Sequence, residues 1–235
     1  FLEQPFTIEN QLVFTGTSIG ILFSDKRYDN ADTMLRDADT AMYHAKDSGK
    51  GRYEVFDASM HQRVQNALSL EADIREAIEW QEFEPYFQPI LQLDNEELKG
   101  FEALARWKST KRGFVYPDDF IPLAEETHLI QAIDLQILQK SCQQLRIWQK
   151  KLLQDDLYVS CNLFCQQFFS PTLPDEIAKI LMQTGLKPEH LRVELTERAL
   201  LENTDIVLAN MKALKQMGVK ILLDDFGTGY SSLSY

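Results

Sequence analysis

Acids and an amide recur where apolar strands would end, and these residues are the best suited to chemistry. Glu102 stands in "FEALAR", Asn162 in "VSCNLF" and Glu194 in "VELTE", and the pair Asp224 and Asp225 follows "KILL". The gaps between them are 60, 32 and 30 residues, and the last two each match one β/α unit. Such oxygen donors, gathered together, would repel one another without a cation, and hard oxygen ligands suit Mg²⁺ or Mn²⁺. The set predicts a divalent-metal site.

Taken singly, each of these residues has a plainer explanation. Glu102 alone is more typical of a solvated charge at a strand end, and Asn162 alone of a turn or capping amide. Asp224 and Asp225 are more telling, because adjacent carboxylates repel one another unless a cation or solvent separates them. Their recurrence at the ends of successive strands favours the metal site.

The turn after the acidic pair, "FGTGYSS", invites two other interpretations. Together with Asp225 it contains the Asp-Phe-Gly triplet that holds magnesium in protein kinases. Kinases also need a Gly-rich loop, a strand lysine and a His-Arg-Asp loop, and no such set precedes it. A Walker-type phosphate loop needs Gly-Lys-Ser/Thr, and this turn has no lysine. Both classes are excluded.

The elements that must position the acids follow from hydrophobic periodicity. We expect strands in "EPYFQPILQL", "LKGFEALARW", "LYVSCNL", "LRVELTE" and "VKILLDDF", and helices over about 119–151, 174–184 and 203–217. The first two strands are close enough to form a hairpin around Asp94 and Asn95. The alternation predicts a largely parallel sheet with covering helices. A (β/α)₈ barrel would need about three strands beyond these five.

Residues 1–57 read as a separate unit. "QLVFTGTSIGILF" is rich in β-branched residues and predicts a strand, "ADTMLRDADTAMYHAKDSG" predicts a helix closed by Gly49, and "RYEVF" predicts a short strand. So few elements do not make a domain of this size. We interpret the unit as the tail of an α+β domain whose front precedes Phe1.

A helical pattern connects this unit to the rest. Met60, Val64 and Leu68 repeat every four residues, which predicts a connecting helix over 58–80. The alternative is that this helix belongs to one continuous domain.

Composition narrows the class of protein. The apolar content is 44% and the charged content 26%, as in an ordinary soluble globular protein. The net charge of −12 argues against binding to duplex nucleic acid, although divalent cations can reverse the sign locally. No apolar run approaches the roughly 20 residues that span a bilayer, so we expect no membrane contact from this segment. The start lacks a basic region and an initiator Met, so we expect no signal peptide and a longer protein.

The sulfur and imidazole groups predict no further site. The three cysteines are too few and too strand-like for a disulfide framework, which favours reduced thiols in a cytoplasmic protein. The four histidines are scattered, which makes a histidine-based zinc site improbable.

From about residue 70 to 235 the sequence resembles the EAL domain family, bacterial phosphodiesterases specific for cyclic di-GMP. The resemblance rests on "YFQPI", "GFEALARW", "FIPLAEETHLI", "VSCNLFCQQF", "LRVELTERALLEN" and "LLDDFGTGYSSLSY". A lone Glu-Ala-Leu occurs by chance, but six such blocks in order are specific. "TSIGILF" and "ADTAMYHAKDSGKGRY" resemble the last part of a GGDEF (diguanylate cyclase) domain. The resemblance implies a TIM-barrel-like EAL domain, cut after about five strands, behind an α+β GGDEF remnant: 1–57 GGDEF, 58–80 connecting helix, 70–235 EAL.

The resemblance also implies roles for individual residues. Those that match the family's first metal site are Glu102, Asn162, Glu194 and Asp224, while Asp225 matches the acid that holds a second ion. Arg106 and Gln88 match contacts to substrate. Glu197 matches the glutamate that anchors the loop after Asp225, which would couple metal binding to dimerisation or regulation. In the GGDEF part, Lys46 and Lys50 match triphosphate contacts, with a solvated helix end as the alternative.

The activity implied is two-metal hydrolysis of cyclic di-GMP to linear pGpG. The family pattern needs a downstream lysine, two glutamates and a glutamine, all beyond Tyr235, so no catalytic base is expected within these residues and the segment alone is expected to be inactive. The alternative is a sensor that binds cyclic di-GMP without cleaving it. We expect a homodimer through the EAL domain and an upstream sensory domain, in a protein that could be tethered to a membrane.

Three residues depart from the family pattern. His128 stands where glycine is usual, Phe164 where serine is usual, and Arg198 where serine is frequent. None removes a metal ligand. Arg198 lies near the loop anchor, so its effect is expected on regulation more than on chemistry.

Overall fold

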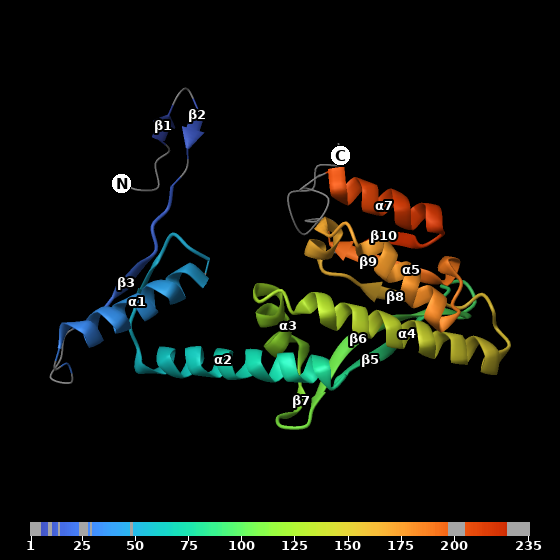
Figure 1. Cartoon of the computed structure of the whole chain (residues 1–235), viewed down its shortest axis with the longest axis horizontal. Coiled ribbons are helices and arrows are strands. Elements are labelled where there is room, and N and C mark those ends of the chain that lie inside the picture. Colours follow the sequence, from blue (N-terminus) through green and yellow to red (C-terminus); the bar gives the residue numbers. More distant parts are fainter. Residues whose placement is uncertain are drawn as a thin grey trace. The chain divides into compact units, whose positions relative to one another are not determined.

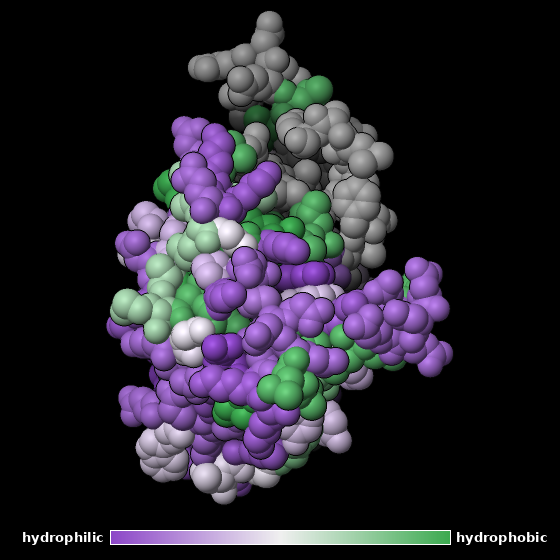
Figure 2. All heavy atoms as spheres, turned by 90° about the vertical axis from the view of Figure 1, so that its right-hand side faces the viewer, coloured by the Kyte–Doolittle hydropathy of each residue, from purple (hydrophilic) through white to green (hydrophobic). Residues whose placement is uncertain are grey.

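The computed structural model describes residues 6–8, 11–13, 15–23, 28, 30–47, 49–196 and 205–224. The chain divides into two compact units, 1–70 and 71–235, and each is treated by itself. On the face seen in Figure 2, hydrophilic residues predominate and hydrophobic ones form smaller groups. Within the described residues no helix is long and apolar enough to cross a membrane.

The first unit is built around one helix and two short pairs of strands (Figure 1). Its elements are β1 (Phe6–Ile8), β2 (Gln11–Val13), β3 (Ile19–Ile21), α1 (Ala31–Asp47) and β4 (Tyr53–Val55). β1 pairs antiparallel with β2, and β3 pairs parallel with β4. The predicted strand "QLVFTGTSIGILF" is therefore two separate strands, whereas α1 and β4 lie where the periodicity predicts.

Helix α1 packs closely on β3 because of a glycine. A Cβ on Gly20 would collide with the backbone of α1 at Ala38 and Met42. Asn30 Oδ1 accepts a hydrogen bond from the backbone N–H of Thr33 at 2.8 Å and so caps the helix start. These local features fix the helix against the strand.

Helix α2 (Ala58–Glu79) runs across the division between the two units. Asp57 Oδ1 accepts a hydrogen bond from the backbone N–H of Ser59 at 2.7 Å, which satisfies one free N–H of the first turn. At its start, His61 Nε2 lies 2.8 Å from Oδ1 of the buried Asp37 on α1. α2 therefore occupies nearly the span predicted for a connecting helix.

The second unit contains a sheet whose strand order is β10-β9-β8-β6-β5, with β7 paired to β6. The strands are β5 (Phe83–Leu91), β6 (Leu98–Ser109), β7 (Gly113–Val115), β8 (Tyr158–Asn162), β9 (Leu191–Thr196) and β10 (Lys220–Asp224). The pairs β6–β8, β8–β9 and β9–β10 are parallel, and β5 pairs antiparallel with β6. The predicted hairpin and the largely parallel sheet are confirmed. Among the described strands the sheet is open at β5 and β10, so barrel closure stays a prediction.

Helices follow the strands and cover the sheet (Figure 1). They are α3 (Pro117–Glu126), α4 (Ile130–Leu152), α5 (Leu173–Thr184) and α7 (Asp205–Met217), with the short 3₁₀ helices η1 (Cys165–Phe169) and η2 (Pro188–His190). Buried strand residues such as Val159, Cys161 and Val193 form the core with Leu138 and Ile177 from the helices. Burial of these side chains, at about 25 cal/mol per Å² of apolar surface, is what holds the helices on the sheet.

The sequence predicts one helix over about 119–151, and the structure has two. α3 ends at Glu126 and α4 begins at Ile130, because His128 adopts a left-handed backbone conformation (φ +59°). A glycine adopts that conformation more easily than any other residue, which explains physically why glycine is usual at this position. The His128 ring compensates in part, since its Nδ1 lies 2.6 Å from Gln166 Oε1 in η1.

Cys142 and Cys161 are buried and Cys165 is half-buried. Burial raises the pKa of Cys142 to about 12 and that of Cys161 well above its usual value. That the thiols are reduced stays a prediction.

Candidate active site at the strand ends

Four predicted site residues lie on four neighbouring parallel strands. Glu102 is on β6, Asn162 ends β8, Glu194 is on β9 and Asp224 ends β10. Asn162 pairs in register with Glu194, and Asp224 lies one strand further. Asn162 and Asp224 lie at the carboxyl ends of their strands and Glu194 lies close to the end of β9. Glu102 lies in the first half of β6, so its predicted position at a strand end is wrong, but the register of β6 against β8 still brings it beside Asn162. Their role as metal ligands remains a prediction.

Hydrogen bonds link these strand ends directly. Asn162 Nδ2 donates to Glu102 Oε1 at 3.3 Å. Ser160 Oγ donates to Glu194 Oε1, and the backbone N–H of Leu163 donates to the backbone oxygen of Glu194 at 3.0 Å. The Ser160 contact was not predicted, although its position two residues before Asn162 on the same strand places both on one face.

Negative charge accumulates around Glu194. Burial raises the pKa of this carboxyl group, and the charges of Glu102 and Asp224 raise it further, against the lowering effect of the Ser160 hydrogen bond. Carboxylates that disfavour one another's ionisation are a donor set that a divalent cation would relieve. The residue types therefore fit a hard cation such as Mg²⁺ or Mn²⁺.

The described side chains do not by themselves form a complete set of metal ligands. Within them, no group of three or more His, Cys, Asp or Glu side chains is close enough to hold a metal ion. Of the predicted site residues, Asp225 and Glu197 lie outside the described residues. The structure thus supplies a strand-end donor set and shows no assembled metal site.

A cavity of about 520 Å³ lies beside these strand ends. The site residues that line it are Arg106, Asn162, Glu194 and Asp224. Helices α3 and α4 contribute apolar side chains and the two acids Glu125 and Asp134 to its wall. A cavity with a cation, an amide and carboxylates in an apolar wall suits a polar ligand of moderate size.

Asp134 is a cavity residue that the sequence analysis missed. Its Oδ2 accepts a hydrogen bond from the backbone N–H of Phe164 at 2.8 Å, just after the strand end at Asn162. The residue as a whole keeps some exposure, but burial of its carboxyl group raises the pKa to about 8, and nearby Glu125 adds to the rise. The available signal was an acid on the helix face that also carries Ile130 and Ile137.

The two predicted substrate contacts lie next to the donor set. Gln88 on β5 pairs in register with Glu102 and is exposed. Arg106 lies four residues beyond Glu102 on β6, lines the cavity and donates from Nη1 to the carbonyl of Ala105 at 2.8 Å. Gln88 is not among the residues that line the cavity, and the role of both residues as substrate contacts stays a prediction.

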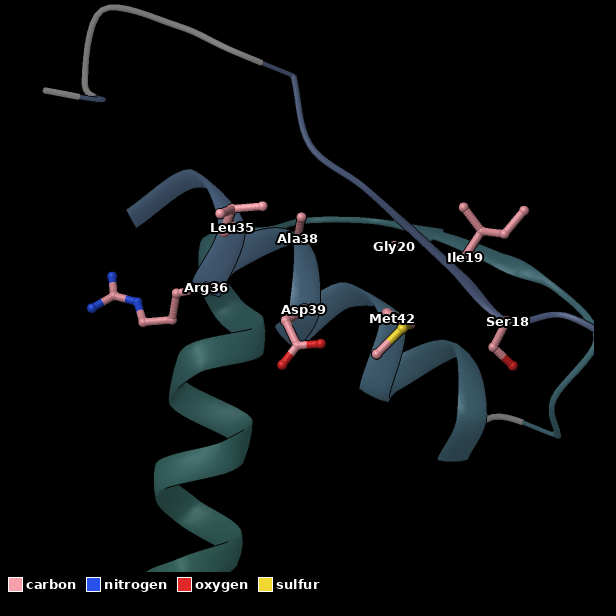
Figure 3. Close-up of a pocket in the computed structure, with 8 residues that line it drawn as sticks. All are labelled: Ser18, Ile19, Gly20, Leu35, Arg36, Ala38, Asp39 and Met42. Atoms are coloured by element: carbon pink, nitrogen blue, oxygen red, sulfur yellow. The ribbon is translucent and has the colours of Figure 1, made fainter. Parts of the chain in front are cut away.

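A second hollow lies in the first unit, and its polar lining residues are Ser18, Arg36 and Asp39. It measures about 600 Å³ and lies between β3 and α1, where Ile19, Leu35 and Met42 supply apolar walls (Figure 3). The predicted phosphate contacts Lys46 and Lys50 are exposed and do not line it. Their role as phosphate contacts stays a prediction.

Comparison with known families matches both parts of the chain. The family described as "EAL domain" matches residues 71–235, and the family described as "Diguanylate cyclase, GGDEF domain" matches residues 1–52. Because the first match covers more than half of the residues, the chain belongs to the EAL domain family. The mixed α/β fold agrees with solved EAL structures.

Individual relatives support the same assignment. The chain is 37% identical, over 100% of its length, to the bifunctional diguanylate cyclase/cyclic di-GMP phosphodiesterase MucR of Pseudomonas aeruginosa, of which it covers 34%. It is 36% identical, over 99% of its length, to the cyclic di-GMP phosphodiesterase PdeR of Escherichia coli, of which it covers 35%. The solved PaMucR phosphodiesterase in complex with c-di-GMP is 38% identical and superposes with a TM-score of 0.65, covering 71% of this chain and 67% of that one. The chain thus spans about a third of the length of these curated relatives.

Proposed function

We propose that the full-length protein containing this segment hydrolyses cyclic di-GMP to linear pGpG with two divalent cations. Glu102, Asn162, Glu194 and Asp224 would hold the first ion, and Asp225 the second. Arg106 would contact a phosphate of the substrate, with Gln88 close by. The observation that carries the proposal is the placement of four oxygen donors on four adjacent strands, beside a cavity that Asn162, Glu194, Asp224 and Arg106 line.

The chain's own residues suggest a division of roles. The Arg106 guanidinium supplies the positive charge on the cavity wall and suits bidentate contact with a phosphate. The Asn162 side chain donates a hydrogen bond from Nδ2 to Glu102, which leaves its amide oxygen as an uncharged candidate metal ligand among the carboxylates. Ser160 holds one oxygen of Glu194, which fixes the direction of the other. Divalent cations, when bound, would activate water and neutralise charge on the phosphate.

Binding without hydrolysis is the second candidate. It is favoured by one observation: the described carboxylates do not by themselves form a group able to hold a metal ion. A binding module would use Arg106 and the cavity but would not need the carboxylates. The two candidates therefore differ in whether loss of a strand-end acid matters.

The test replaces Glu102 in the full-length protein. Glu102→Ala should abolish the release of pGpG, measured by chromatography with Mg²⁺ or Mn²⁺ present. The matched control is Glu97→Ala, which removes an exposed acid bonded to Lys99 near the start of the same strand and should leave turnover unchanged. Binding of cyclic di-GMP, followed by calorimetry in a chelator, separates the candidates. If Glu102→Ala retained turnover, the assignment would be refuted; wild-type binding without turnover would favour the sensor.

Further proposals concern the rest of the protein. We propose domain limits of 1–57 for the GGDEF part, 58–80 for the connecting helix and 70–235 for the EAL part. On the family resemblance alone, we propose two roles for residues: Lys46 and Lys50 contact phosphate, and Glu197 anchors the loop. On the same ground we propose dimerisation through the EAL domain, a cytoplasmic location and an upstream sensory domain.

A further inference from the structure

Three aromatic rings stand exposed in a row beside the cavity. Tyr86 on β5 and Phe114 on β7 are each 42% exposed, and Tyr116, the residue before α3, is 65% exposed. The ring centroids of Tyr86 and Phe114 are 6.3 Å apart, and those of Phe114 and Tyr116 are 5.2 Å apart. Exposed apolar side chains that group in one place on a surface are typical of binding sites.

Two cations lie over the first of these rings. Arg106 Cζ is 5.8 Å and Lys108 Nζ 5.4 Å from the centroid of Tyr86. Both stand on β6, two residues apart, and so share one face of the strand. We call this group of three rings and two cations the aromatic strip: Tyr86, Arg106, Lys108, Phe114 and Tyr116.

The strip is continuous with the candidate site. Arg106 belongs to the strip and also lines the cavity with Asn162 and Glu194. Pro117, the residue after Tyr116, lines the same cavity. A ligand held in the cavity by its phosphate would therefore reach the rings without leaving the surface.

Packing among the described residues does not account for the strip. The core side of the same strands is filled by Phe83 and Trp107, which are fully buried against Phe120. Trp107 pairs with both Phe83 and Val115, so β5 and β7 lie on opposite edges of β6. The contact between the Tyr86 and Phe114 rings stabilises the three strands β5, β6 and β7. It does not explain why Tyr116, beyond the end of β7, exposes its ring to solvent.

We propose that the aromatic strip is a subsite for one purine base of the cyclic dinucleotide, stacked on Phe114 and Tyr116. This inference rests on the proposed function. Bases stack on exposed aromatic rings, and arginine beside them adds cation–π attraction. Arg106 and Lys108 are cationic in a protein of net charge −12, so they suit the anionic backbone of the same ligand. The aromatic strip would thus recognise the base, while Glu102, Asn162, Glu194 and Asp224 would hold the metal ion for the reaction.

The experiment measures cyclic di-GMP affinity of the full-length protein by calorimetry in a chelator, which prevents turnover. Tyr116→Ala and Tyr116→Leu should each weaken binding about tenfold or more, because both lose the ring and the second keeps apolar bulk. Tyr116→Phe should retain wild-type affinity. Phe114→Ala should resemble Tyr116→Ala. The matched control is Tyr53→Ala, which removes an equally exposed tyrosine from the first unit and should change nothing.

The outcomes separate this inference from the proposed function. If the wild-type protein binds and cleaves cyclic di-GMP while Tyr116→Ala, Tyr116→Leu and Phe114→Ala keep its affinity, the subsite is wrong and the function stands. If Tyr116→Leu binds normally and only the Ala variants are weak, the strip supplies bulk and no stacking, which also overturns the inference. A wild-type protein that neither binds nor cleaves cyclic di-GMP overturns both.

Discussion

The amide of Asn162 donates a hydrogen bond to the carboxylate of Glu102 across two adjacent parallel strands, at 3.3 Å. The two residues are 60 positions apart in the sequence, so their contact depends on the register of β6 against β8. That register pairs Glu102 with Ser160 and Gly100 with Tyr158. The strand-end donor set is therefore only as well ordered as this strand pair.

Gly100→Ala should disturb that register. A Cβ on Gly100 would lie 2.7 Å from the Tyr158 ring, which is also held by Arg192 stacked 3.2 Å above it. Because backbone and a fixed ring must move, we expect a loss of about 1–3 kcal/mol in the free energy of unfolding. Denaturant titration measures it. An unchanged midpoint would show that the ring shifts freely and that the strand pair tolerates the methyl group.

Asn210→Ala should loosen the segment that follows Asn162. The buried Asn210 side chain on α7 donates from Nδ2 to the carbonyls of Phe168 and Ser170, at 2.9 and 2.8 Å. Losing both bonds should cost about 1–3 kcal/mol, seen as a lower melting temperature. Lys179→Ala, on the exposed side of α5, is the control and should have little effect.

Asp134 should make stability fall as pH rises. Its pKa is about 8 in the folded protein because its carboxyl group is buried, against a usual value of 3.8. The folded state therefore keeps a proton that the unfolded state releases above pH 4, and stability declines between about pH 4 and 8. Asp134→Asn keeps an acceptor for the N–H of Phe164 and should flatten this decline, whereas the exposed control Asp156→Asn should not. Equal pH profiles for the wild type and Asp134→Asn would contradict the assignment.

Glu82 should have the opposite dependence. Burial alone would raise its pKa, but hydrogen bonds from Trp107 at 2.9 Å and Thr110 at 2.7 Å lower it below the usual 4.5. A depressed folded pKa gives stability that is present above pH 4.5 and lost as pH falls through the folded value. Glu82→Gln should cost about 1 kcal/mol at pH 7 and less at pH 3. A cost that stays constant with pH would rule out the charge as its source.

Periodicity and turn chemistry predicted much of this fold. The hairpin of β5 and β6, the parallel strands and the strand-end position of Asn162 follow from local pattern, since each strand is an apolar run that stops at a polar residue. The break between α3 and α4 did not follow, because it depends on a left-handed conformation at His128, which is uncommon for residues other than glycine. The three-residue strand β7 is too short to give a periodic signal.

The site residues that the sequence predicts are those recognisable from their residue type and their spacing along the chain. Glu194 and Asp224 follow from acids near the ends of apolar strands, whereas Glu102 lies in the first half of β6 and its predicted strand-end position is wrong. Asp134 was not found, since its significance comes from burial against Phe164, a contact between distant segments. The exposure of Tyr116 likewise depends on how β7 meets α3, which no local pattern specifies.

The central claim is that the strand-end donors support metal-dependent hydrolysis, and one titration tests it most directly. Full-length protein is freed of metal with a chelator, and the release of pGpG from cyclic di-GMP is followed as Mg²⁺ is added back, for the wild type and for Glu194→Gln. The account predicts no release without Mg²⁺, recovery on addition, and a need for much more Mg²⁺ in Glu194→Gln. Release that persists in the chelator, or one Mg²⁺ dependence shared by both proteins, would contradict it.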